Sequence, residues 1–142
     1  MSDDEDAIER FLLDFPEGIR HQAHVLRSLV RRTRPASIER IRPGWRLIGY
    51  DLPVGKRGRY FAYIAPELEH VHLGFEYGTL MSDPDELLHG AHLGLKKVRY
   101  LTYLPGDAIP SQAVLRLVNE GAEIAAMTTS ERVARLHERR LT

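Results

Sequence analysis

The sequence predicts an α+β domain: an antiparallel meandering sheet of about four to six strands, with N- and C-terminal helices packed on one face. Two stretches with helical apolar spacing come first, short strands rich in aromatic and β-branched residues follow, and a further helical stretch comes near the end. Strands grouped between helices, rather than alternating with them, favour α+β over a parallel α/β sheet. The 142 residues are predicted to form a single domain, because domains commonly have roughly 100–200 residues.

Two helices are predicted at the start. The first covers residues 4–14, where apolar side chains recur at i, i+3 and i+4 and acidic residues at its beginning complement the helix dipole. The second begins after Phe15-Pro16 and ends before Pro35, because proline is tolerated in a first turn but not in a helix interior. Its predicted buried stripe consists of Ile19, Ala23, Leu26, Leu29 and Val30.

The strands follow from a change of composition after Ala36. They are predicted at residues 37–41, 45–52, 59–64, 69–76 and 97–103. Gly55-Lys56-Arg57-Gly58 is the predicted turn of a hairpin. In the 69–76 strand apolar and polar residues alternate, which is typical of a sheet covered by helices on only one face.

The remaining segments are predicted to be helical. Asp83–Leu88 is expected to form a single helical turn with Asp83 as its N-cap and Gly90 just past its end. A helix after Pro110 should bury Val114, Leu117, Val118, Gly121, Ala122 and Ala125. Thr128-Thr129-Ser130-Glu131 is a capping-box pattern, so residues 128–142 are predicted to include a separate final helix.

Composition excludes several function classes. The chain has no Cys, which excludes thiol catalysis and thiolate-held metal clusters. Lys+Arg 20 and Asp+Glu 20 cancel to a net charge of zero, so we expect no nucleic-acid partner. The acidic start and the short apolar runs predict a cytoplasmic protein with no membrane contact. Neither phosphate-binding loops nor nucleophile motifs are present, so we predict that the protein is not an enzyme.

Residues 70–75 (HVHLGF), 78–80 (GTL), 83–90 (DPDELLHG) and 96–100 (KKVRY) together resemble the YdhG-like domain, a bacterial family largely of unknown function. The resemblance covers about residues 8–125, with Gly78–Gly90 as its most specific part, and leaves the acidic residues 1–7 and the tail helix outside. It implies a frataxin-like fold, and some members are assigned as iron chaperones. The chain departs from the family where Ala91–Leu95 intervene before Lys96.

The candidate metal ligands are five residues on and after one strand. An imidazole and carboxylate set of this kind suits iron or another divalent metal, weakly bound. The set is His70, His72, Glu76, His89 and His92. The alternative is that these residues are polar groups on a solvated sheet face. The resemblance also implies secondary acidic candidates on the first helix, Asp6 and Glu9, for which the alternative is a favourable helix-dipole interaction.

A basic stripe on the second helix is a candidate partner- or anion-binding surface, with a solvated helix face as the alternative. It consists of Arg20, Arg27, Arg31 and Arg34.

The leading hypothesis is a non-enzymatic binding module that acts as a frataxin-like weak iron or divalent-metal carrier. The second hypothesis is a metal-independent protein- or ligand-interaction domain that uses the open sheet face and this helix. Such a domain would dock an acidic protein, or a second copy of the chain through the open face.

Overall fold

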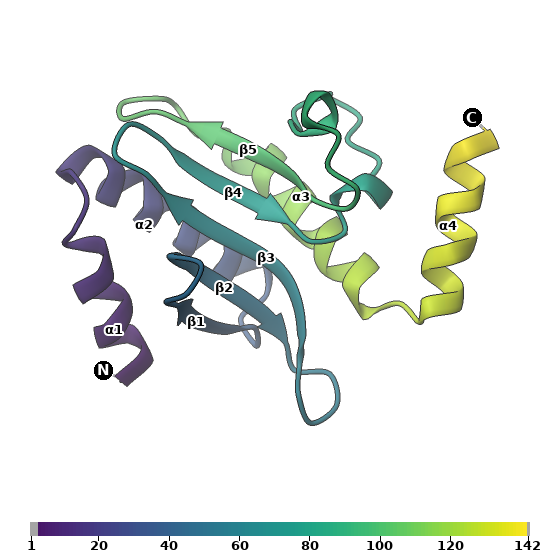
Figure 1. The fold of residues 1–142 in the computed structure, drawn as a ribbon, viewed down its shortest axis with the longest axis horizontal. Helices are drawn as coiled ribbons and strands as arrows, with labels where there is room; N and C mark the ends of the chain where they lie inside the picture. The colour runs from purple at the N-terminus through teal and green to yellow at the C-terminus, as the bar shows by residue number, and fades with distance from the viewer. Residues whose placement is uncertain (1–2, 142) are drawn as a thin grey trace.

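The computed structural model describes residues 3–141, which form a five-stranded antiparallel sheet with helices behind one face (Figure 1). Consecutive strands are neighbours throughout, so the sheet is a simple meander and the predicted α+β architecture is confirmed. The strands are β1 (Ile38–Arg42), β2 (Leu47–Leu52), β3 (Arg59–Pro66), β4 (Val71–Phe75) and β5 (Arg99–Tyr103). Residues 1–2 of the predicted acidic start and residue 142 of the predicted tail lie outside the described residues.

Four α-helices accompany the sheet: α1 (Asp3–Leu12), α2 (Glu17–Thr33), α3 (Ser111–Ala126) and α4 (Thr129–Leu141). Helices α2 and α3 pack against each other and on the central strands, and the residues predicted for their buried stripes are all buried. Helix α4 stands to one side of this body (Figure 1). No helix within residues 3–141 combines the length and apolar character needed to cross a membrane.

The core lies between the helices and one face of the sheet. Alternate strand residues point to this side, because successive side chains of a strand face opposite ways. Each large apolar side chain buried there contributes roughly 1.5–3 kcal/mol relative to an exposed one. The fully buried members include Ile8, Leu12, Leu26, Ile48, Tyr50, Phe61, Ile64, Leu73, Phe75 and Ile124.

A β-bulge decides which aromatic residues of β3 face the helices. Tyr50 pairs with Ala62, but Asp51 pairs with Tyr60, so Phe61 is an extra residue in β3. Phe61 turns into the core, where it is fully buried, and Tyr60 stays on the opposite side of the sheet. The alternation of faces along β3 is thus interrupted once, because the neighbouring residues Phe61 and Ala62 are both buried on the helix side.

The predicted helical turn at residues 83–88 is wrong. The segment is a loop in which Asp83 has φ +42° and its carboxylate accepts the N–H groups of Leu87 and Leu88 at 2.9 and 3.0 Å. A helix N-cap would instead bind donors two or three residues on, so the chain wraps around this carboxylate rather than coiling. Two short 3₁₀ turns, η1 (Gly78–Leu80) and η2 (Ala91–Leu93), were not predicted.

The predicted capping box at the start of α4 is confirmed. The N–H of Thr128 donates to Glu131 Oε1 at 2.9 Å, and the N–H of Glu131 donates to Thr128 Oγ1 at 3.1 Å. Two of the donors that a helix start leaves unpaired are therefore satisfied reciprocally. These local bonds let α4 begin only three residues after α3 ends.

A buried arginine joins the N-terminal helices to the sheet. Arg27 of α2 is 4% exposed, and its guanidinium donates to Glu9 of α1 at 2.8 Å and to both oxygens of Glu39 in β1 at 3.0 and 3.1 Å. The Tyr50 hydroxyl donates a short hydrogen bond to the same Glu39 carboxylate. Burial opposes ionisation of Glu39, but the bonds from Arg27 and Tyr50 outweigh it and hold its pKa below the usual range.

We expect Arg27→Met to lower the free energy of unfolding by roughly 3–5 kcal/mol, because Glu39 would stay buried without its cation. Adding Glu39→Gln should restore about half of that loss, because the amide oxygen can still accept the Tyr50 hydrogen bond without carrying a charge. Urea unfolding at pH 7, followed by circular dichroism, measures both effects. Arg32→Met, an exposed position on the same helix, is the matched control and should change stability by less than about 0.5 kcal/mol. Equal effects of Arg27→Met and Arg32→Met would contradict the prediction.

Candidate binding surface on the open face of the sheet

One face of the sheet has no helix over it among the described residues (Figure 1). We call this the open face, and its side chains come from all five strands. Most of them are partly exposed, as expected where strand residues meet solvent rather than a helix layer. The open face comprises Arg40, Arg42, Gly49, Asp51, Tyr60, Tyr63, His72, Gly74, Tyr100 and Thr102.

The strand register places large side chains and glycines alternately in one row across the open face. Gly49 pairs with Arg40 on one side and Tyr63 on the other, and Gly74 lies between Tyr63 and Tyr100. Glycine inside a strand costs roughly 0.5–1 kcal/mol relative to alanine, and it commonly marks a place where another group approaches closely. Two such glycines in one row therefore indicate a requirement beyond forming the sheet.

Gly74 makes room for the Tyr63 ring. A Cβ atom at Gly74 would overlap Cζ, Cε1 and Oη of Tyr63, so the ring occupies the space of the missing side chain and lies along the sheet. The ring thus packs on β4 at Gly74, and the Tyr63 side chain stays partly exposed.

Gly49 makes the same kind of room for Arg42. A Cβ atom at Gly49 would overlap the Arg42 side chain and approach Tyr60 Cε1 at 3.2 Å. The Arg42 guanidinium lies 4.7 Å from the Tyr60 ring centroid, and it donates to both Asp51 oxygens at 2.8 and 2.9 Å. Trp45, which is 66% exposed, meets the Tyr60 ring edge to face at 6.2 Å. These contacts extend the flat surface from β4 to the β1–β2 turn.

Burial raises the pKa values of both Tyr60 and Tyr63 above the usual range. Their hydroxyl groups therefore stay protonated at neutral pH and can donate hydrogen bonds at the surface. Burial also raises the pKa of Glu76, which follows β4, and Lys97 opposes that shift. The Asp51 carboxylate on the open face is paired with Arg42.

Two of the five predicted metal ligands lie side by side. The rings of His70 and His72 are 4.5 Å apart, and His72 Nδ1 lies 2.9 Å from Thr102 Oγ1. Burial and the neighbouring His70 lower the pKa of His72, so its imidazole is neutral at pH 7. A neutral imidazole has a nitrogen lone pair for a hydrogen bond or a metal ion.

The other three predicted ligands do not complete a site with this pair. His89 pairs with Tyr100 of β5, with ring centroids 6.0 Å apart, and it also lowers the pKa of His72, whereas His92 is exposed in η2. Glu76 follows the opposite end of β4 from His70. Across residues 3–141 no group of three or more His, Asp or Glu side chains is arranged to hold a metal ion. The predicted five-residue set is therefore reduced to the His70 and His72 pair.

The predicted helix sites are largely occupied by internal contacts. Glu9 binds Arg27 and lies 3.5 Å from His24, so this secondary acidic candidate has partners, and Asp6 remains partly exposed on the same helix. Arg27 is buried rather than solvent-facing, which corrects the prediction of a continuous basic surface stripe.

The other arginines of that stripe also bind within the molecule. Arg20 donates to the Phe15 carbonyl at 2.7 Å, and Arg34 donates to Asn119 Oδ1 of α3 at 2.8 Å. Arg31 lies 3.7 Å from Glu5 and is half exposed. These side chains hold α2 to its neighbours, because long cationic side chains can pack their stems and pair their ends at the same time.

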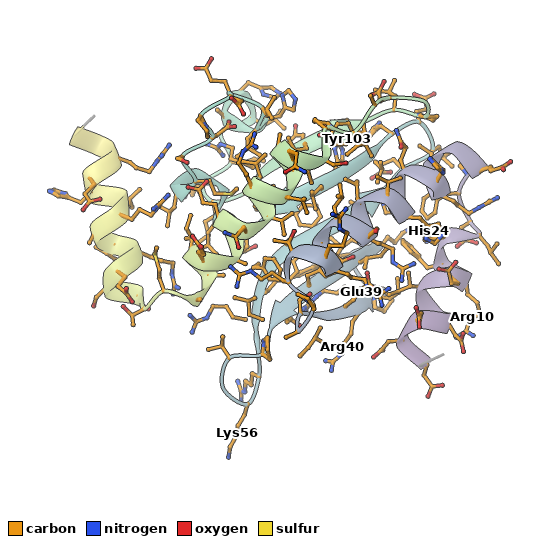
Figure 2. All side chains as sticks on the ribbon, turned by 180° about the vertical axis from the view of Figure 1, so that it is seen from behind. Arg10, His24, Glu39, Arg40, Lys56 and Tyr103 are labelled. Carbon is orange, nitrogen blue, oxygen red and sulfur yellow. The ribbon has the colours of Figure 1, made fainter. Side chains whose placement is uncertain are left out.

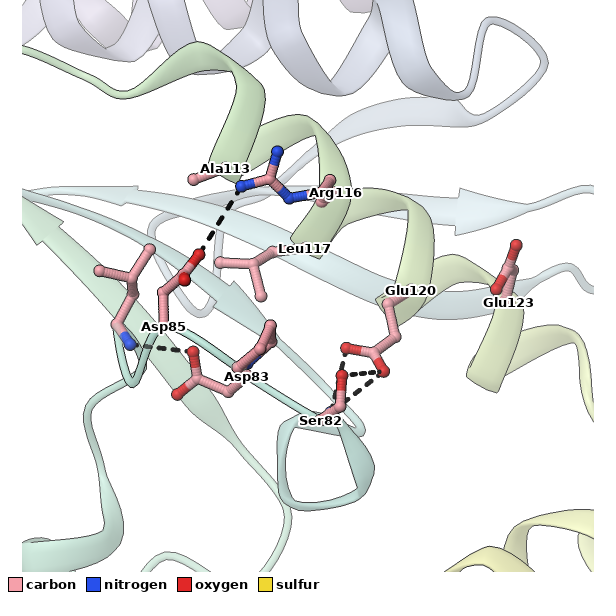
Figure 3. A pocket seen from close by; sticks show the side chains of 10 residues that line it. Ser82, Asp83, Asp85, Ala113, Arg116, Leu117, Glu120 and Glu123 are labelled. Carbon is pink, nitrogen blue, oxygen red and sulfur yellow. Dashed lines mark hydrogen bonds and ion pairs between the residues drawn. The ribbon is translucent and has the colours of Figure 1, made fainter.

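A hollow of about 240 Å³ lies between the 82–87 loop and α3 (Figure 3). Its carboxylates are also used internally: Asp85 pairs with Arg116 at 3.6 Å, and Glu120 accepts from Ser82 and from Arg135 of α4. These contacts around the hollow hold the 82–87 loop and α4 against α3.

Sequence reasoning assigned the polar face of β4 to solvent but missed how its rings are arranged. The available signal was a glycine at an open-face position in each of two strands, Gly49 and Gly74.

Comparisons of this chain with protein-family models, with curated proteins and with solved structures find no match. The resemblance to the YdhG-like domain stays a prediction.

We expect Gly74→Ala to destabilise the protein by about 1 kcal/mol, because the new Cβ would push the Tyr63 ring off the sheet. In a Tyr63→Ala background the same change should be neutral or stabilising by about 0.5 kcal/mol, since alanine is better than glycine in a strand. A double-mutant cycle from urea unfolding measures the difference. The same cost in both backgrounds would show that Gly74 does not serve the Tyr63 ring.

Proposed function

We propose that this protein is a non-enzymatic binding domain whose partner binds to the open face of the sheet. The observation that carries the proposal is that Tyr63 and Arg42 fill the space over two glycines of the open face, beside Tyr60 and Trp45. Tyr, Trp and Arg are the residue types that contribute most to binding energy at interfaces. Because these side chains are already held in place, binding would cost little conformational entropy.

The helix side supports binding less well than the sheet. Arg20, Arg27 and Arg34 are engaged in internal hydrogen bonds, so using them for a partner would break contacts between elements. In the hypothesis of a metal-independent interaction domain, the binding surface is therefore the open face alone. The surface there offers aromatic rings and guanidinium groups, which favour a partner with planar or anionic groups.

Capture from a lysate of the source cells tests the proposal. The baits are the wild-type chain, Tyr63→Ser/Tyr100→Ser on the open face, and Arg31→Gln/Arg32→Gln on the helix side. We expect the wild type and the helix variant to retain the same protein, nucleic acid or small molecule, and the open-face variant to lose it. An acidic protein or a second copy of this chain would be detected in the same eluate.

Circular dichroism of each bait shows whether it is folded. A ligand that the folded open-face variant keeps, and that the helix variant loses, would place the binding surface on α2. An eluate empty for all three baits would also count against the proposal.

The second candidate function is weak binding of a divalent metal ion. It is favoured by the His70 and His72 rings, which are 4.5 Å apart on the open face. Two imidazoles with water in the remaining positions suit iron or zinc as a labile cargo. This candidate retains the metal-carrier part of the sequence-based hypothesis with two ligands instead of five.

Anaerobic calorimetry with Fe²⁺, and separately with Zn²⁺, tests the metal site. The wild type and His89→Ala/His92→Ala should bind one ion, and His70→Ala/His72→Ala should show a loss of at least about tenfold in affinity. The His89/His92 variant is the matched control, because it removes two imidazoles and leaves His70 and His72 in place. Absence of binding heat from the wild type, or equal affinity of both variants, would contradict the site.

A further inference from the structure

We infer that the ligand of the open face is single-stranded nucleic acid, with bases stacked on its rings and phosphates held by arginines beside β1. This inference rests on the proposed function and adds the class of partner. It reverses the expectation drawn from a net charge of zero, which describes the whole chain rather than one face.

Tyr63 is an exposed ring in the middle of the open face. It occupies the space of the missing side chain at Gly74, and its own side chain is partly exposed. Exposed aromatic side chains stack on nucleobases regardless of sequence, because every base has a π-face. Any larger residue at Gly74 would stand in the place of the ring and tilt it upward.

The aromatic surface extends across the whole sheet. Trp45 contacts Tyr60, Tyr63 lies between the two glycines of the row, and Tyr100 contacts His72 at 4.9 Å on the far side. The rings thus continue from the β1–β2 turn to β5, which provides more than one stacking position. A strand of several unpaired bases fits this extent better than a single nucleotide, and a duplex would hide its base faces.

Positive charge lies beside the aromatic rings. A hollow of about 390 Å³ next to Tyr60 is lined by three arginines and one carboxylate. The arginines are Arg40, Arg42 and Arg57, and the carboxylate, Asp51, is paired with Arg42 through both its oxygens. Such a groove is complementary to a phosphate backbone, which arginine binds through a planar set of donors.

The two outer arginines of this groove are accessible. Arg40 is 58% exposed, and its nearest acid, Asp4, is 4.0 Å away and 60% exposed, so a phosphate can replace it. Arg57 is exposed in the β2–β3 hairpin turn. Figure 2 shows Arg40 and the hairpin residue Lys56 toward the same side of the molecule. An acidic peptide would use these cations but has few planar groups for the rings.

Direct binding of purified protein tests the inference. The probes are fluorescein-labelled twelve-nucleotide oligo(U) and oligo(dT), a twelve-base-pair duplex, and uridine monophosphate as competitor. We expect both single strands to bind at least about tenfold more tightly than the duplex or the mononucleotide, with an affinity that falls as salt is raised. Trp45 is the only Trp in the chain, so quenching of its fluorescence by unlabelled strands reports stacking at the open face.

Variants distinguish the contribution of base stacking to single-strand affinity from that of the arginine charges. Tyr63→Ala should weaken single-strand binding at least about fivefold, whereas Tyr63→Phe should bind like the wild type because it keeps the ring. Arg40→Gln/Arg57→Gln should weaken binding and reduce the salt slope by about 0.7 for each arginine. Arg31→Gln/Arg32→Gln removes the same charge from the helix side and should leave binding unchanged.

Several outcomes would overturn the inference. These are absence of single-strand binding, equal affinity for the duplex or the mononucleotide, and equal losses in the two double-arginine variants. A protein captured by the wild type and lost by the Tyr63→Ser/Tyr100→Ser bait, together with no binding of either oligonucleotide, would overturn the inference and leave the proposed function standing.

Discussion

The buried guanidinium of Arg27 is the interaction on which the arrangement of the two layers depends. A charge out of contact with water must be matched by acceptors, and only this packing brings Glu9 of α1 and Glu39 of β1 to Arg27 of α2 together. Because Glu39 must face the helices, its neighbour Arg40 must face the other way, as side chains alternate along a strand. The same ion pair that holds the helix layer therefore directs the β1 arginines to the open face.

The charged groups of the helix side serve the structure. Arg20 and Arg34 hold α2 to its neighbours, and Glu120 ties the 82–87 loop and α4 to α3. Local pairing of this kind occupies several of the charges that the sequence places on the helices. The open face differs, since its glycines reduce the intrinsic stability of the strands while allowing large planar groups to lie flat. That combination is the physical argument for placing binding on the sheet.

The metal hypothesis shows where sequence spacing stops being informative. His70 and His72 are two residues apart on one strand, so their proximity follows from the period of a strand alone. Whether His89 and His92 approach them depends on the course of the loop after β4, for which the sequence offers no periodic signal. That loop wraps around the Asp83 carboxylate instead of forming a helical turn, and it brings His89 beside Tyr100 rather than to the pair.

The sequence by itself determined the order of the α-helices and strands, the α+β class, the apolar stripes of α2 and α3 and the capping box before α4. Each of these follows from local periodicity or from hydrogen bonds between near neighbours. Only the tertiary structure decided that Arg27 is buried, that Phe61 enters the core while Tyr60 does not, and that Tyr63 lies over Gly74. These depend on strand register and on contacts between residues far apart in the chain. A one-residue bulge or a distant acceptor changes which face a side chain occupies without changing the local pattern.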